Sequence, residues 1–219
     1  MNRCNFFNLQ NLLNQREKKV FHICNYIVTH VSFIAFFSLL TLLSFLSKSE
    51  DLLLWETDKP LQIEDFRAIQ NDTIKRGNQF LGAMSSIKIQ FRTLQKGKNT
   101  VPEISIKNYF DRNESWILVK EDYVLQHEQI HFDISELYTR KLRKSVESLQ
   151  QKKVSNLEIY KKKLNYWNHI SQQTNNAFDK ENNDSYTLKN GTFILNKNPK
   201  QKEWKNKIEN ELNEMNAFK

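Results

Sequence analysis

Residues that break helices or form tight turns are scarce in this chain. Its 219 residues include only four glycines and three prolines. These two residue types supply most of the turns that an all-β sandwich or barrel needs. The composition therefore favours a helix-rich structure, and the length suits one domain with an additional anchor segment.

Cysteine is almost absent. The two cysteines, Cys4 and Cys24, precede residue 26, and the rest of the chain has none. Residues 26–219 therefore contain no disulfide bond and no thiolate ligand for a metal. Any metal site in this part of the chain must use histidine and carboxylate side chains.

Charged residues are missing from one long stretch near the amino terminus. Residues 26–47 are almost continuously apolar and contain no Asp, Glu, Lys or Arg. A helix of this length spans about 30 Å, enough to cross one bilayer. Basic residues precede it and acidic residues follow it. The positive-inside rule then predicts a cytoplasmic segment at 1–25, a membrane anchor at 26–47 and an extracytoplasmic domain at 48–219.

A cleaved signal peptide is the alternative interpretation of the apolar stretch, and it would make the domain a secreted protein. The apolar core is longer than the usual 7–15 residues of a signal peptide. Ser47-Lys48-Ser49 is also a poor match to a small-x-small cleavage site. We therefore favour a retained anchor.

The net charge of +8 is compatible with binding to nucleic acid or to an anionic surface. However, no recognised nucleic-acid-binding module is visible in the sequence. We therefore interpret the charge as a solvated basic surface and expect no nucleic-acid partner.

The most specific pattern in the chain is H-E-x-x-H at residues 127–131, within a helical periodicity that covers Tyr123–Leu149. Residues four apart lie on the same face of a helix, so His127 and His131 can bind one metal ion. Glu128 is the next residue after His127, so its side chain points to one side of the histidine face. From there it can reach a metal-bound water rather than the metal. The pattern therefore predicts a zinc hydrolase with Glu128 as the general base.

Two ordinary core or surface histidines are the alternative to a metal site. Helical spacing continues the face of His127 and His131 through Ile134, Tyr138, Leu142, Ser145 and Leu149. The histidines thus belong to the inward, mostly apolar stripe of the helix. Because buried polar groups without partners are costly, a shared metal ion is the favoured explanation.

A catalytic zinc ion needs a third protein ligand, and the motif helix does not supply an obvious one. Leu137 occupies the position of the third histidine of metzincins, which excludes that class. Glu136 lies about 140° round a straight helix from His131 and is poorly aimed. Asp133 is aimed still worse. Both carboxylates are predicted to orient a ligand histidine or to pair with Arg140.

A second group of carboxylates lies downstream and is free to fold back over the metal. It consists of Asp179, Glu181 and Asp184. We favour this group over Glu136 as the source of the third ligand.

The remaining chain shows strand-like patterns before the motif and helical patterns after it. Strands are predicted within Ala83–Leu94, Val101–Phe110 and Ser115–Val119, helices at Val154–Asn175 and Lys202–Asn216, and a hairpin around Asn190-Gly191. This order predicts an α+β domain with a small antiparallel or mixed sheet over the motif helix and a helical carboxyl-terminal part.

The extended motif resembles a bacterial family of predicted secreted zinc-dependent proteases, a domain family of unknown function in the zincin-like superfamily. Its pattern reads H-E-Q-x-H-F-D-[IL]-x-E-x-x-A-R-x-L. The matching residues are His127, Glu128, Gln129, His131, Phe132, Asp133, Glu136, Arg140 and Leu142, with Thr139 where Ala is usual.

The resemblance extends over roughly residues 54–212. Leu61–Phe66 looks like an L-x-W-x-D-F element with Ile63 in place of Trp, Ser115-Trp116 looks like a strand S-W, and Phe178–Asp184 looks like a Y-D-x-E-T-x-H element. Gln201 to Leu212 is similar to the closing helix. In this family pattern a histidine stands at the position of Asp184.

The resemblance implies a zincin-like metalloprotease domain at a bacterial cell envelope. It would bind Zn²⁺ and cleave a protein or peptide substrate, with Glu128 as catalytic residue and His127 and His131 as metal ligands. A catalytically inactive zincin-like module with a binding or structural role is the alternative. Detection of bound zinc without cleavage would favour that alternative.

Overall fold

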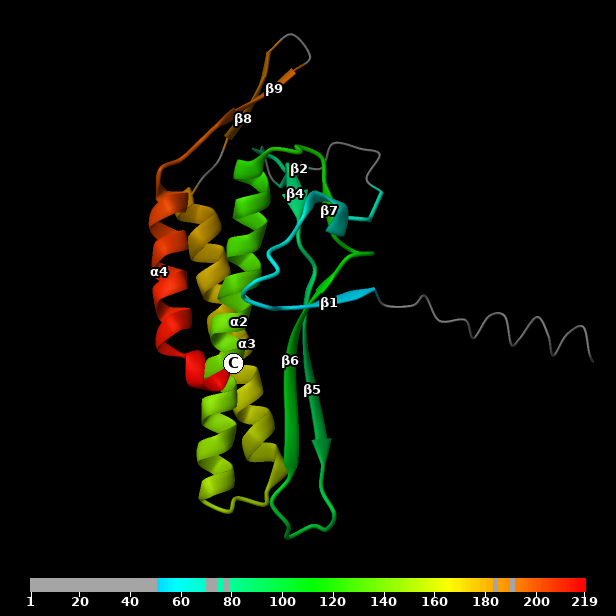
Figure 1. Ribbon diagram of the computed structural model, residues 1–219, viewed down its shortest axis with the longest axis vertical. Helices are drawn as coiled ribbons and strands as arrows, with labels where there is room; N and C mark the ends of the chain where they lie inside the picture. The colour runs from blue at the N-terminus through cyan, green and yellow to red at the C-terminus, as the bar shows by residue number, and fades with distance from the viewer. Residues whose placement is uncertain (1–50, 70–74, 77–78, 183–184, 190–191) are drawn as a thin grey trace, which may run out of the picture. The chain divides into compact units, whose positions relative to one another are not determined.

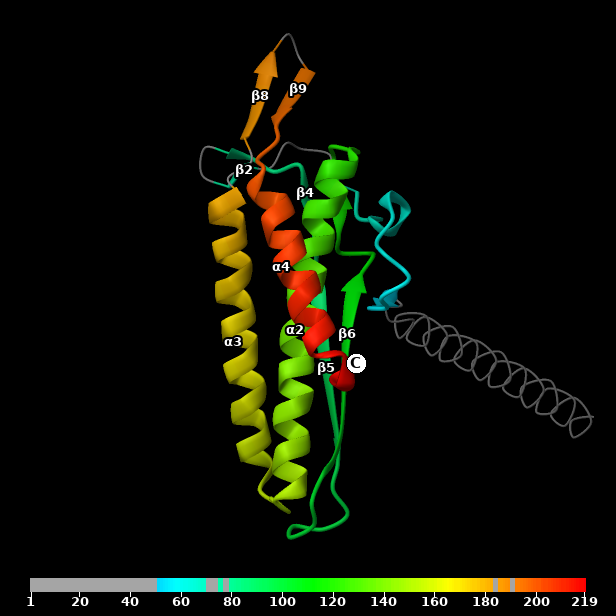
Figure 2. The ribbon, with the colours of Figure 1, turned by 60° about the vertical axis from the view of Figure 1, so that its left-hand side comes forward.

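A 30-residue helix, α2 (Asp122–Gln151), runs between a small sheet on one side and two further helices on the other (Figures 1 and 2). The computed structural model describes residues 51–69, 75–76, 79–182, 185–189 and 192–219. Most strands precede α2 along the chain, and a short pair of strands lies between the two helices that follow it. The predicted α+β class is confirmed, whereas the zincin-like fold remains a prediction.

The main sheet is antiparallel and has the strand order β1-β6-β5. Its strands are β1 (Leu52–Leu54), β5 (Ile87–Leu94) and β6 (Glu103–Asp111). The long β5–β6 pairing runs from Ile87 opposite Phe110 to Leu94 opposite Glu103. Alternate residues of β6, including Ile106, Asn108 and Phe110, are buried, as expected for a strand with one face on the core.

Three short two-stranded pairs complete the described β-structure. They are β2 (Lys75–Arg76) with β3 (Gln79–Phe80), β4 (Ala83–Met84) with β7 (Trp116–Ile117), and β8 (Ser185–Lys189) with β9 (Thr192–Asn196). The β8–β9 pair corresponds to the hairpin predicted around Asn190-Gly191. Asn190 and Gly191 themselves lie outside the described residues. The β4–β7 pair places the link between β4 and β5 beside α2.

Helix α3 (Leu157–Asn182) returns antiparallel to α2, and α4 (Lys200–Glu214) packs against both of them (Figure 2). A 3-10 turn, η2 (Asn216–Phe218), follows α4. Helix α3 continues to Asn182, beyond the predicted end at Asn175. The extension is polar and asparagine-rich, which disguises it as a loop in the sequence, but Phe178 anchors it in the core with no exposed surface.

The core lies on both sides of α2. On the sheet side, Phe132 of α2 packs against Phe110 of β6, with 5.8 Å between ring centroids. On the helical side, Ile134 and Leu137 pack with Phe178 and with residues of α4. Because apolar residues surround much of α2, its position relative to the sheet and to α3 is well determined by packing.

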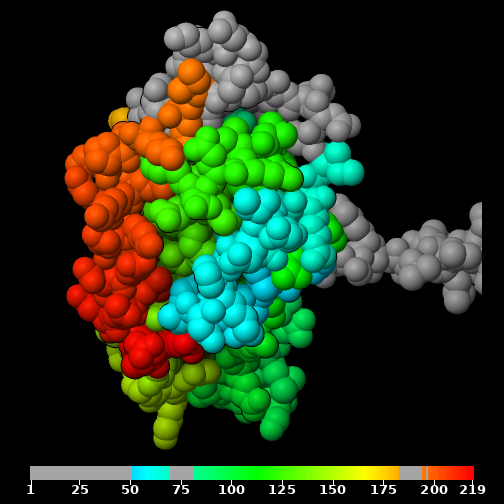
Figure 3. Space-filling view, turned by 45° about the horizontal axis from the view of Figure 1, so that its top comes forward, coloured from blue at the N-terminus to red at the C-terminus, as the bar shows by residue number. Residues whose placement is uncertain are grey.

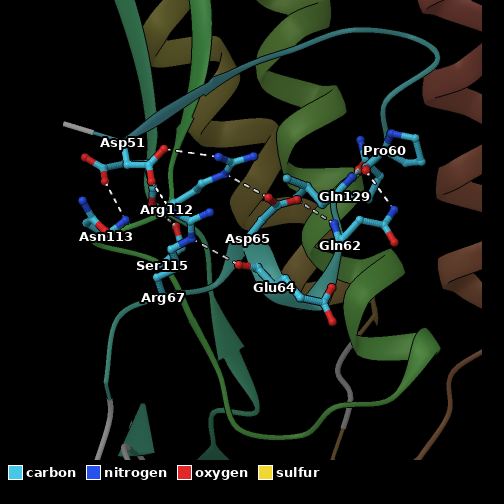
Figure 4. A network of polar contacts seen from close by, with 12 residues as sticks. Asp51, Pro60, Gln62, Glu64, Asp65, Arg67, Arg112, Asn113, Ser115 and Gln129 are labelled. Carbon is cyan, nitrogen blue, oxygen red and sulfur yellow. Dashed lines mark hydrogen bonds and ion pairs between the residues drawn. The ribbon is translucent and has the colours of Figure 1, made fainter. Parts of the chain in front are cut away.

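The segment of residues 51–69 lies across α2, beside α4 (Figure 3). A 3-10 turn, η1 (Ile63–Asp65), forms part of it. A polar network links this segment to Arg112, the residue that follows β6 (Figure 4). Arg112 donates to Asp51 at 3.2 Å and pairs with Asp65 at 2.9 Å, and Arg67 also donates to Asp51. The network links the beginning of the domain, η1 and the end of β6.

The predicted cytoplasmic segment 1–25 and membrane anchor 26–47 lie outside the described residues. Among the helices that the structure does describe, none is long and apolar enough to cross a bilayer.

Candidate metal centre

Helix α2 presents His127 and His131 side by side on the face that packs against α3. The two Nε2 atoms are 3.0 Å apart, and the ring centroids are separated by 4.8 Å. Both side chains are mostly buried, with 18% and 15% of their surface exposed. The two histidines therefore lie together on one inward face of the helix, as the sequence predicts.

Helix α3 brings a carboxylate to the same point. Oδ1 of Asp179 lies 3.4 Å from Nε2 of His127 and 2.9 Å from Nε2 of His131. Among the described residues, these three form the group of His, Cys, Asp and Glu side chains that could hold a metal ion. Two histidines and a carboxylate form one of the usual ligand sets of a catalytic zinc ion.

The spacing of the three ligand atoms can be tested against the geometry of a zinc site. Their separations are 3.0, 3.4 and 2.9 Å. The circle through three such points has a radius of about 1.8 Å, which is shorter than a Zn–N bond of about 2.0–2.1 Å. One ion can therefore lie at bonding distance from all three atoms, on one side of their plane. The residues fit a zinc ion with further coordination positions left for water or substrate.

Two asparagines of α3 contact the other nitrogens of the imidazole rings. Oδ1 of Asn175 lies 2.6 Å from Nδ1 of His131, so the amide oxygen accepts the Nδ1 proton and the Nε2 lone pair points to the ligand group. The amide nitrogen, Nδ2, of Asn182 lies 3.0 Å from Nδ1 of His127. Coordination through Nε2 requires Nδ1 of His127 to carry the proton, so the amide oxygen of Asn182 must face this ring when metal is bound.

Phe178 forms the inner wall of the site. Its ring centroid lies 4.6 Å from that of His127 and 5.0 Å from that of His131, and its far side packs against Trp204. The aromatic wall restricts rotation of both imidazole rings. The site is thus closed towards the helical core and accessible on the side of Asp179, whose side chain is 31% exposed.

The contacts of Asp179 stabilise the charged form of its carboxyl group. Burial acts to raise its pKa, but hydrogen bonds and charge interactions with His127 and His131 outweigh burial and hold the pKa well below its usual range. The carboxylate is therefore ionised at neutral pH, as a metal ligand must be.

Glu128 contacts the link between β4 and β5 through its carboxylate. Its side chain is 5% exposed, and its Oε2 accepts a hydrogen bond of 2.5 Å from the Ser85 hydroxyl. Glu128 is not a member of the metal-binding group. Its role as a general base stays a prediction.

The other three candidates for the third ligand have different positions. Glu181 is exposed and accepts a hydrogen bond from the indole of Trp204 at 3.0 Å. Glu136 is buried in ion pairs with Arg140 at 3.1 Å and Arg143 at 2.8 Å. Asp184 lies outside the described residues. Of the predicted candidates that the structure describes, Asp179 is therefore the one beside the two histidines, and Glu136 pairs with Arg140.

Asp133 contacts the segment between β1 and η1, directly through Trp55 and indirectly through Gln129. Its Oδ1 accepts hydrogen bonds from the Trp55 indole at 2.8 Å and from Gln129 at 2.7 Å, and Gln129 in turn accepts from the main chain of Leu61. Burial raises the pKa of Asp133 to about 6. The side chain lines a cavity of about 680 Å³ that includes none of the three ligand residues. Asp133 therefore docks the β1–η1 segment rather than orienting a histidine.

Sequence reasoning missed Asn175, Asn182 and Ser85. Asparagine and serine are common on surfaces and in loops, so they carry no strong signal in a single sequence. The spacing of Asn175, Asp179 and Asn182 (i, i+4 and i+7) could have indicated their role, because these three residues share one face if the helix continues to Asn182.

Replacing Asp179 by asparagine is expected to weaken zinc binding by more than about 100-fold, because loss of an outer partner alone typically costs 10–100-fold. The amide keeps the shape but removes the negative charge that the ligand group provides. Competition with a zinc-chelating dye measures the affinity. Glu181→Gln, two residues along the same helix, is the matched control and should bind zinc like the wild type. Equal affinity in Asp179→Asn would show that Asp179 is not a ligand.

A comparison of the chain with known protein families, curated proteins and solved structures found no match.

Proposed function

We propose that this protein is a zinc-dependent peptidase. The observation that carries the proposal is the convergence of two Nε2 atoms and Oδ1 of Asp179 at spacings suited to one zinc ion, with Glu128 on the same helical turn. A metal held by three protein groups and open on one side is the arrangement of a catalytic site rather than a closed structural one. The resemblance to predicted secreted zinc-dependent proteases supports the same reaction class.

Zinc bound at this site would lower the pKa of a water molecule and polarise the carbonyl group of a substrate. Glu128 accepts a proton from the water as its oxygen attacks the carbonyl carbon of the peptide. Glu128 then delivers this proton to the leaving nitrogen as the C–N bond breaks. His131 and His127 are held in place by Asn175, Asn182 and Phe178, so the ligand group needs little rearrangement during the reaction.

The test of the proposal combines metal analysis with an activity assay on the purified full-length protein. We expect about one zinc ion per chain and cleavage of an unfolded, fluorescently labelled polypeptide. A chelator should abolish cleavage, and added zinc should restore it. His131→Ala should lose both the metal and the activity. Undiminished cleavage by His131→Ala would contradict the proposal, because hydrolysis would not then depend on this site.

We further propose that the domain faces outward at the bacterial cell envelope, with residues 26–47 in the lipid bilayer. Four basic residues precede the apolar stretch, whereas on its carboxyl-terminal side Lys48 is followed closely by the acidic Glu50 and Asp51, and this charge difference supports the orientation. A reporter enzyme that works only outside the cytoplasm should be active when fused after Lys219. A fusion reporter that is active only in the cytoplasm would contradict the orientation.

A further inference from the structure

The side chain of Glu128 has one specific partner on the sheet side of the molecule. The Ser85 hydroxyl donates to Oε2 of Glu128 at 2.5 Å, a short distance typical of a hydrogen bond from a hydroxyl to a carboxylate. Within the described part of the chain, this is the only hydrogen bond to the Glu128 carboxylate. Its second oxygen, Oε1, is therefore left to exchange a proton with another group.

Ser85 lies in a link that the surrounding strands hold firmly. Met84, the residue before it, pairs with Trp116 across the β4–β7 ladder. Ser86, the residue after it, has its main-chain N–H bonded to Oγ of Ser115 at 2.9 Å and its carbonyl bonded to the N–H of Asp111 at 2.8 Å. Because both neighbours are fixed, the Ser85 hydroxyl is a preorganised donor.

We infer that Ser85 is a positioning residue for the general base: it holds Oε2 of Glu128 and so directs Oε1 at the proton that the reaction transfers. The inference rests on the proposed peptidase function. A carboxylate with one oxygen fixed retains a single acceptor in a defined direction, whereas a free glutamate side chain samples several rotamers. Proton transfer depends on such alignment, since small displacements of a reacting group can reduce rates about 100-fold.

The test compares Ser85→Ala with the wild-type full-length protein under zinc-saturating conditions. We expect kcat to fall by about 10–100-fold with KM changed by less than about threefold, because the hydroxyl acts on proton transfer and not on substrate binding. Zinc content should be unchanged. Ser85→Thr retains the hydroxyl and should restore most of the lost kcat. A Ser85→Ala variant with wild-type kcat would overturn the inference.

Ser86→Ala is the matched control for loss of a serine hydroxyl at the adjacent position. The Ser86 side chain donates to Glu114, an exposed residue, at 2.9 Å and does not contact Glu128. This variant should keep the wild-type kcat. An equal loss of kcat in Ser86→Ala and Ser85→Ala would indicate a general disturbance of the link and would overturn the specific role of Ser85.

Two measurements separate this inference from the proposed function itself. In the Glu128→Gln background, Ser85→Ala should cause little further loss, because a positioning residue acts through its partner. The ¹³C resonance of the Glu128 carboxyl carbon should shift in Ser85→Ala but not in Ser86→Ala, even in zinc-free protein. If the wild type cleaves no peptide, the proposed function fails. If it cleaves and neither kcat nor the resonance responds to Ser85→Ala, only the role of Ser85 fails.

Discussion

Replacing Glu128 by glutamine is expected to reduce the rate of peptide hydrolysis by about 10²–10⁴-fold, the usual contribution of a general base. Glutamine has the shape of glutamate and can still accept the hydrogen bond from Ser85 through its amide oxygen. It cannot take up a proton at neutral pH. The loss should therefore appear mainly in kcat, measured with a labelled unfolded polypeptide under zinc-saturating conditions.

The same variant separates a base from a ligand. The ligand group consists of His127, His131 and Asp179, so Glu128→Gln should retain about one zinc ion per chain. Its thermal unfolding midpoint should also stay close to that of the wild type. Cleavage by Glu128→Gln at the wild-type rate would refute the role of this residue. In that case a binding or structural role without catalysis becomes the better account of the protein.

Replacing Glu136 by alanine is expected to destabilise the folded protein by about 3–5 kcal/mol, the typical cost of breaking a buried ion pair. Glu136 and Arg140 are each only 2% exposed, and Oε1 of Glu136 bonds both Arg140 and Arg143. Arg140 also donates to the main-chain carbonyl of Leu212 at 2.7 Å. Removal of the carboxylate leaves a buried guanidinium without its counter-charge where α2 meets the end of α4.

Urea unfolding followed by tryptophan fluorescence measures this loss. Glu211→Ala is the matched control, since Glu211 pairs with Lys141 at 2.9 Å across the same two helices but in a more exposed position. A surface pair of this kind contributes about 0–1 kcal/mol. The folded fraction of Glu136→Ala should still bind one zinc ion. Loss of zinc by folded Glu136→Ala would mean that this carboxylate, and not Asp179, completes the ligand group.

Local sequence determined the part of the site that lies on one helix. The spacing of His127 and His131 places both rings on one face for any α-helical backbone, and Glu128 must then point to one side. The absence of cysteine after residue 26 restricted the possible ligands to histidine and carboxylate. These conclusions required only helical geometry and the chemistry of side chains. The α+β class followed in the same way from alternating and helical patterns.

Only the tertiary structure decided which carboxylate lies beside the two histidines and which residue contacts Glu128. Asp179 reaches the histidines because α3 continues through a polar stretch that local propensity disfavours. Burial of Phe178 stabilises this part of the helix, as do the hydrogen bonds that Asn175 and Asn182 share with the imidazole rings. Ser85 meets Glu128 because the β4–β7 pair sets the link beside α2. Such contacts between residues more than 40 positions apart depend on how helices and strands pack, and periodicity along the chain carries no information about that packing.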